Sequence, residues 1–180
     1  MSFHPIYLFY GEDEYRLEER LNRLIDEMVD PAWKEMDRIT LDMTKVTIQD
    51  AIGEAETLPF GSERKVIVAK NAYFLTGSTL RGGVEHRSEV LQDYMVNPTP
   101  TTVLILVAPY AKLDERKKVV KDLFKKANVF HAKPFTDQER EKWLRDELRR
   151  RNIKLAEEDF PYLSYQLPKN PMQAHHELDK

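Results

Sequence analysis

Short runs of consecutive apolar residues recur along most of this chain, and amphipathic helical patterns separate them. Such runs are typical of strands buried on both faces of a parallel sheet. The strands predicted in this way are Ile6–Tyr10, Met36–Leu41, Val66–Ala69, Thr102–Ala108 and Val129–Phe130. Because helices are predicted between them, we expect an α/β domain in which helices flank a parallel five-stranded sheet.

Apolar residues spaced three or four positions apart predict the helices. The predicted helices run from about Glu14 to Met28, from Thr47 through Ala55, from Val84 to Val96 and from Glu115 to Lys126. Residues 75–83 are rich in glycine and small polar residues, so we expect a flexible connection there, with 76–83 poorly ordered.

The strand pattern stops after Lys133-Pro134-Phe135, which is therefore a predicted linker. Thr136 and Glu139 have the spacing of a capping box and predict the start of a new helix. Its apolar stripe contains Trp143, Leu144 and Leu148; a second helix is expected from about Ala156 and a third over 172–180. We expect residues 1–133 to form the α/β domain and residues 134–180 a partial helical domain. So small a helical part buries little surface, which predicts an N-terminal fragment of a longer protein.

Charge excludes one class of function for the chain as a whole. Lysine and arginine number 28 against 31 aspartates and glutamates, a formal net charge of −3, so the strong positive charge of an autonomous nucleic-acid binder is absent. The best basic patch consists of Arg145, Arg149, Arg150, Arg151 and Lys154, with Glu139, Glu141, Asp146 and Glu147 interleaved. This pattern indicates a solvated helix face, and phosphate contact is the alternative.

Cysteine is absent, which excludes disulfides and thiolate chemistry. No apolar run approaches the ~20 residues that span a bilayer, and the N-terminus lacks the basic-then-apolar pattern of a secretion signal. We therefore expect a cytoplasmic protein without membrane contact.

The turn after the first strand is where a nucleotide-binding α/β protein carries its phosphate loop. Here it reads Gly11-Glu12-Asp13-Glu14-Tyr15, without the lysine and serine or threonine that phosphate and Mg²⁺ require. Three carboxylates would repel a triphosphate but suit the positive end of a helix dipole. Lys70-Asn71 and Ala108-Pro109 follow the third and fourth strands, so the aspartate of a phosphoryl acceptor is missing as well.

No other catalytic or metal-binding pattern emerges. The histidines lack metal-ligand spacing; they are His4, His86, His131, His175 and His176. No nucleophile motif surrounds the serines. We therefore expect no catalytic residue, cofactor or metal.

The segment from Leu58 to Lys65 joins a predicted helix to a predicted strand. Pro59 fixes its own φ and restricts Leu58 to extended geometry, and Gly61 permits a tight turn, so Leu58 and Phe60 are expected at a loop tip. Two interpretations remain open. Phe60 folds back over the core, or Leu58 and Phe60 enter a pocket on a partner.

Three blocks of the chain are similar to one known family: Ile6 to Asp13 with Tyr15, Glu56 to Val68, and Leu104 to Val107. The sequence resembles the delta subunits of bacterial DNA polymerase III, the clamp-loader components of the HolA family. This resemblance runs along the whole chain, and its middle block is the most specific. It implies a degenerate AAA+ module, then a helical lid that is only partly present, with the C-terminal collar domain absent.

The resemblance also implies a function. In that family two neighbouring hydrophobic residues at the loop tip enter a pocket of the ring-shaped sliding clamp. Phe60 matches the aromatic residue, and either Leu58 or Pro59 matches its neighbour. Residues Glu63, Arg64 and Lys65 are candidate rim contacts. Active relatives carry an Asp-Glu pair where Lys70-Asn71 stands.

The chain is therefore expected to be a non-catalytic accessory subunit of the DNA-directed DNA polymerase holoenzyme that binds and opens the clamp in DNA replication. Its expected partners are the clamp (beta subunit) and, through the full-length protein, the gamma/tau and delta-prime subunits, with DNA contacted indirectly or weakly. Two alternatives stay open: a degenerate AAA+ scaffold with another partner, and an ATPase with an unusual phosphate site that involves Lys70.

Overall fold

A computed structural model describes residues 3–180 of the chain, and strands alternate with helices up to residue 131. The elements in chain order are β1 (Ile6–Tyr10), α1 (Glu14–Met28), α2 (Lys34–Asp37), β2 (Arg38–Asp42), α3 (Ile48–Ala55), β3 (Lys65–Lys70), the 3₁₀ turn η1 (Tyr73–Leu75), α4 (Ser88–Val96), β4 (Thr102–Ala108), α5 (Lys118–Lys126), β5 (Asn128–His131), α6 (Asp137–Arg150), α7 (Phe160–Gln166) and α8 (Pro171–Leu178).

The strands form one five-stranded sheet in the order β2-β3-β4-β1-β5, and every neighbouring pair is parallel. The predicted α/β class and five-stranded parallel sheet are confirmed. The central strands read as continuous apolar runs because helices cover both faces of the sheet. Every residue of β4 is buried, for example.

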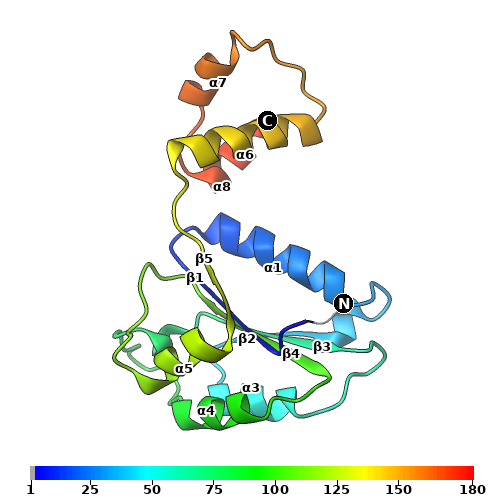
Figure 1. Cartoon of the computed structure of the whole chain (residues 1–180), viewed down its shortest axis with the longest axis vertical. Helices are drawn as coiled ribbons and strands as arrows, with labels where there is room; N and C mark the ends of the chain where they lie inside the picture. Colours follow the sequence, from blue (N-terminus) through cyan, green and yellow to red (C-terminus); the bar gives the residue numbers. More distant parts are fainter. Residues whose placement is uncertain (1–2) are drawn as a thin grey trace. The chain divides into compact units, whose positions relative to one another are not determined.

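Helix α1 lies on one face of the sheet, and α3, α4 and α5 lie on the other (Figure 1). Alternate side chains of β4 point to opposite faces of the sheet. Leu104 and Leu106 belong to the cluster under α3–α5, whereas Val103 and Ile105 belong to the cluster under α1. The hydrophobic core of this part therefore consists of two layers divided by the sheet.

The chain divides into two compact units, one ending at Ala132 and the other comprising Lys133–Lys180. The second unit contains α6, α7 and α8. The predicted capping box opens α6: Thr136 Oγ1 accepts from the Glu139 amide at 3.3 Å, and Glu139 Oε2 accepts from the Thr136 amide at 2.9 Å. The predicted stripe on α6, formed by Trp143, Leu144 and Leu148, is buried.

Two helices begin later than predicted. Helix α4 begins at Ser88 rather than Val84, because residues before it make long-range hydrogen bonds instead of helical ones. The Tyr73 hydroxyl donates to the Val84 carbonyl at 3.1 Å, and His86 contacts the loop before α3. Helix α5 begins at Lys118 rather than Glu115, after a turn in which the Lys117 amide donates to the Asp114 carbonyl.

The second predicted strand was also placed too early. Met36 and Asp37 end a four-residue helix, α2, and the strand β2 begins at Arg38. In the second unit, α7 begins at Phe160 rather than near Ala156. No helix within residues 3–180 is long and apolar enough to cross a membrane.

Candidate functional site

The loop between α3 and β3 places two large apolar side chains in solvent. Leu58 is 79% exposed and Phe60 is 71% exposed, whereas Pro59 between them is half-buried. The interpretation in which Phe60 folds back over the core is therefore wrong. Ala55, the last residue of α3, and Val66 of β3 are both buried, so the two apolar side chains project from a firmly anchored base.

The side chain of Asp37, at the end of α2, binds the backbone of this loop. Its side chain is fully buried, and its two carboxylate oxygens accept hydrogen bonds from three consecutive backbone amides. Phe60 donates to Oδ1 at 2.5 Å, while Gly61 and Ser62 donate to Oδ2 at 3.0 and 2.6 Å. Burial by itself raises the pKa of Asp37, but these amide hydrogen bonds outweigh burial and leave the pKa below its ordinary value.

Trp33 lies beside the loop tip and extends its apolar surface. The Trp33 and Phe60 ring centroids are 5.7 Å apart, with the rings tilted by 54°. A Cβ atom added to Gly61 would overlap the Trp33 indole, so only glycine lets the loop pass this close. Trp33 is 37% exposed, and the side chain of Met36 on α2 is also exposed.

The three candidate rim residues lie in different surroundings. Glu63 is exposed, and the Arg64 guanidinium lies over the Phe3 ring, 4.9 Å from its centroid. Lys65 is only 3% exposed, which contradicts its assignment to the rim.

Lys65 instead turns inward because it begins the buried strand β3. Its ammonium donates to the Glu54 carbonyl at 2.5 Å and to the Thr57 hydroxyl. Burial lowers the pKa of Lys65, and the charges of Glu54 and Asp37 offset part of this effect. The residue therefore ties the end of α3 to the start of β3.

The turn after β1 is a helix cap in this structure. The Asp13 carboxylate accepts from the Arg16 amide at 3.1 Å and caps α1. Gly11 has φ +132°, and a Cβ atom there would overlap the backbone of Ala132. The acidic turn thus lies at the N-terminus of α1, where its charges suit the helix dipole as predicted, and Asp13 in addition caps the helix.

A small cavity of about 110 Å³ lies beside this turn, where the carboxyl ends of β3 and β4 meet α1. The residues that line it are Glu14, Leu17, Glu18, Lys70, Asn71, Val107 and Pro109. Lys70 pairs with Glu18 at 3.1 Å. The cavity is well below the ~300 Å³ of small ligand pockets, and two of the side chains that line it, Glu14 and Glu18, are acidic.

The predicted basic patch, on the second half of α6 and just after it, consists largely of paired arginines. Arg145 pairs with Glu141 and Glu157, Arg149 with Asp146, and Arg150 and Arg151 with Glu147. These ion pairs fit the interpretation of a solvated helix face. Within residues 3–180, no group of three histidine or acidic side chains could hold a metal ion.

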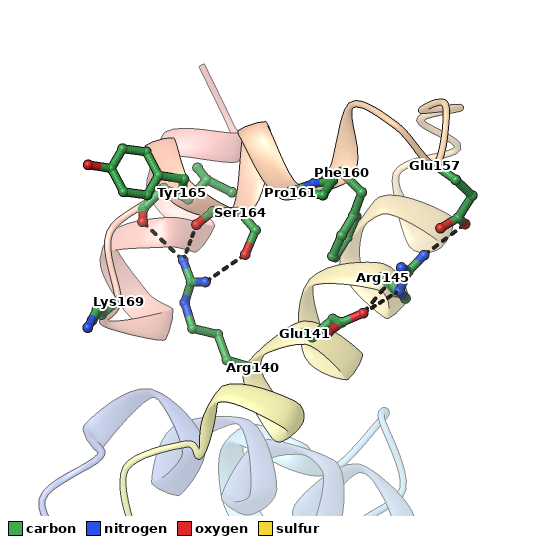
Figure 2. A pocket seen from close by; sticks show the side chains of 10 residues that line it. Arg140, Glu141, Arg145, Glu157, Phe160, Pro161, Ser164, Tyr165 and Lys169 are labelled. Atoms are coloured by element: carbon green, nitrogen blue, oxygen red, sulfur yellow. Dashed lines mark hydrogen bonds and ion pairs between the residues drawn. The ribbon is translucent and has the colours of Figure 1, made fainter.

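The second unit has an open pocket of about 500 Å³ between α6 and α7, shown in Figure 2. The Arg140 guanidinium donates to the Ser164 hydroxyl at 2.9 Å and to the Leu167 carbonyl at 3.0 Å. The Arg145 guanidinium lies 4.0 Å from the centroid of the Phe160 ring. These arginines therefore join α6 to α7.

Sequence reasoning missed Asp37 and Trp33, and it misplaced Lys65. Asp37 lies more than twenty positions before the amides that it holds, so no local pattern connects the two segments. The one available signal was Asp37 itself, a charged residue inside an apparent strand.

Comparison with known proteins supports one assignment. Residues 7–133 match the family model described as DNA polymerase III, delta subunit. The DNA polymerase III subunit delta of Bacillus subtilis (strain 168) is 40% identical over 136 residues, which cover 76% of this chain and 39% of that protein.

Solved structures extend the comparison. The Bacillus subtilis DNA clamp loader delta protein (YqeN) superposes with a TM-score of 0.81 and 33% identity, over 98% of this chain and 52% of that chain. AMPPCP-bound DnaA from Aquifex aeolicus, with a TM-score of 0.54 and 14% identity over 99% of this chain and 54% of its own, shares the fold. The chain thus spans between 39% and 54% of the length of these three relatives. On the family match and these similarities, the chain belongs to the DNA polymerase III delta-subunit family, with an AAA+-like α/β fold.

Proposed function

We propose that this chain binds a DNA sliding clamp through the loop at Leu58–Phe60 and serves as the clamp-opening part of a clamp loader. The observation that carries the proposal is the exposure of Leu58 and Phe60 on a loop whose backbone is fixed from below. Exposed apolar side chains cost free energy in an isolated protein, and a partner's pocket removes that cost.

The energetics fit a small, concentrated contact. Burying an aliphatic and an aromatic side chain contributes roughly 1.5–3 kcal/mol each. The exposed surface of Trp33 and Met36 adjoins the tip and adds apolar area. Glu63 and Arg64 flank the tip and remain the candidate rim contacts.

Opening a ring requires no chemistry from the subunit that binds it. A subunit that binds the open or strained ring more tightly than the closed ring shifts the equilibrium by that difference in affinity. The other proposed partners are the gamma/tau and delta-prime subunits of a clamp loader.

We further propose that this chain does not hydrolyse ATP. The acidic turn at Glu12–Glu14 caps a helix, and Lys70 of the neighbouring cavity is paired with Glu18. Neither feature suits a triphosphate.

Calorimetry of the chain with the sliding clamp of the same species tests the proposal. We expect Phe60→Ala to weaken binding by ~2 kcal/mol or more, about thirtyfold, because the aromatic anchor is removed. Leu80→Ala is the matched control, since Leu80 is also exposed but lies in a different loop. ATP alone should give no binding heat.

Circular dichroism must show that both variants remain folded. If folded Phe60→Ala binds the clamp as tightly as the wild type, or if the wild type does not bind, the proposal is wrong.

A further inference from the structure

Two buried side chains of opposite charge lie under the loop tip: Asp37, which the sequence did not single out, and Lys65, which it placed at the rim. We infer that Asp37 and Lys65 are positioning residues, which fix the loop backbone so that Leu58 and Phe60 stand ready for the clamp. This inference rests on the proposed function, because it concerns how the same loop achieves its affinity.

Asp37 fixes the second half of the loop. The amides of Phe60, Gly61 and Ser62 all point at its carboxylate, and the donor–acceptor distances run from 2.5 to 3.0 Å. Hydrogen bonds to an ionised acceptor are roughly twice as strong as neutral ones. Three successive amides directed at one anion leave the backbone little freedom at these positions.

Lys65 fixes the first half of the loop. Its ammonium binds the Glu54 carbonyl in the last turn of α3 and the Thr57 hydroxyl just beyond that helix. The Thr57 hydroxyl itself donates to the Glu54 carbonyl at 2.9 Å. A cation at a helix C-terminus satisfies carbonyls that lack intrahelical donors and complements the helix dipole.

The tip lies between these two anchors. An anion holds amides after Pro59 and a cation holds oxygen atoms before Leu58, so the intervening residues have a defined path. The Trp33 ring packs against Gly61 and Phe60 from one side. The apolar side chains therefore stay in solvent instead of collapsing onto the core.

A loop held in this way has lost its conformational freedom before it meets a partner. Ordering a flexible segment on binding reduces affinity, and preorganisation removes that penalty. The two buried charges thus raise clamp affinity without touching the clamp. Their burial costs free energy of solvation, which the amide, carbonyl and hydroxyl partners offset.

The test compares Asp37→Asn with the wild type. The variant keeps the shape of the side chain, but its NH₂ group cannot accept a hydrogen bond and its charge is gone. We expect faster hydrogen exchange at the amides of Phe60, Gly61 and Ser62 and about tenfold weaker clamp binding, with the far-ultraviolet circular dichroism unchanged. Lys65→Met removes the ammonium that binds the Glu54 carbonyl and the Thr57 hydroxyl, so it should increase the mobility of the first half of the loop.

Asp42→Asn is the matched control. Asp42 also accepts a backbone amide, that of Thr44 at 3.0 Å, but it stabilises the turn after β2 rather than the loop. This variant should leave both the exchange of the loop amides and clamp affinity unchanged.

The outcomes separate the inference from the proposed function. If Phe60→Ala abolishes binding while folded Asp37→Asn binds like the wild type, the loop contacts the clamp but Asp37 does not position it, and the inference is wrong. If Phe60→Ala has no effect, the proposed function fails and the inference fails with it.

A second measurement covers the case in which neither Asp37→Asn nor Lys65→Met folds. A linear peptide of residues 56–64 carries the same tip without either buried charge. We expect this peptide to compete for the clamp at least tenfold more weakly than the folded chain. A peptide that competes equally well would overturn the inference.

Discussion

Within six positions of the sequence, the usual preferences of two residue types are reversed. The Phe60 ring lies in solvent, whereas the Lys65 ammonium is buried. Lysine is almost never fully buried without partners, and here carbonyl and hydroxyl oxygens bind it. Burial of a lysine is tolerable only where hydrogen-bond partners satisfy its ammonium. The Phe60 ring is therefore accessible to a partner, whereas the Lys65 ammonium is held within the fold.

His86 is a half-buried titratable residue with a structural role. Its Nδ1 accepts from the Ile48 amide at 3.0 Å, which leaves Nε2 to donate to the Met43 carbonyl at 2.7 Å. The ring also stacks on Phe74, with centroids 4.4 Å apart. These contacts require the neutral imidazole, and burial lowers the pKa of His86 below its ordinary value.

The pH dependence of stability follows from that lowered pKa. The unfolded chain, with a histidine pKa near ~6.5, binds the proton more tightly than the folded chain, so His86 destabilises the fold as the pH falls below about 6.5. We expect urea unfolding to show that the stability difference between wild type and His86→Gln shrinks from about pH 7.5 to about pH 5. A difference that stays constant over this range would contradict the assignment.

At the scale of elements, α3 matters most for the site because the loop begins where it ends. Thr47 caps its first turn by accepting from the Asp50 amide at 3.1 Å, and its inward residues Ile48, Ala51 and Ile52 are buried. At the other end, the buried Thr102 hydroxyl donates to the Ala55 carbonyl at 2.7 Å. The helix is thus fixed at both ends. Gly53, in its interior, is the residue that favours the helix least.

Gly53 is exposed, and a Cβ atom there would meet nothing within 4 Å. We expect Gly53→Ala to stabilise the protein by about 0.5–1 kcal/mol in chemical denaturation, because alanine loses less backbone entropy in a helix. Gly11→Ala is the contrasting variant and should destabilise by roughly 1–3 kcal/mol, since Gly11 has a positive φ and contacts Ala132. Equal effects of the two variants would refute this account.

Element boundaries show where sequence patterns reach their limit. Strands β1, β3 and β4 were predicted closely because burial on both faces leaves a continuous apolar run. The starts of α4 and α5 were not, because Val84, His86 and Lys117 bind groups far away in the chain, and such bonds leave no local pattern. A four-residue helix such as α2 has too few positions to show a period.

At the scale of the whole molecule, the chain consists of two compact units, and each unit has its own buried apolar residues. Every residue assigned to the loop site, including Asp37 and Lys65, belongs to the first unit. The site therefore needs nothing from α6, α7 or α8 for its internal hydrogen bonds. The family relationship likewise rests mainly on this unit, since the matched residues are 7–133.

A chain truncated after residue 133 tests this independence. We expect it to unfold cooperatively and to bind the clamp with an affinity within about twofold of the longer chain, because its sheet and both core layers are intact. Thermal unfolding and calorimetry provide the two measurements. Loss of clamp binding by a folded truncated chain would show that the second unit contributes to the interface.

The sequence by itself determined the α/β class, the parallel sheet, the acidic turn at the start of the helix after β1 and the presence of an apolar segment between α3 and β3. These features depend on local periodicity, turn residues and composition, which the chain carries at each position. Only the tertiary structure decided that Phe60 lies in solvent, that Lys65 lies inside and that Asp37 and Trp33 support the tip. The contacts of Asp37 and Trp33 with the tip join segments more than twenty residues apart, and those of Lys65 reach Glu54 and Thr57, eleven and eight residues away. These contacts are set by the packing of the sheet and its helices rather than by any local pattern.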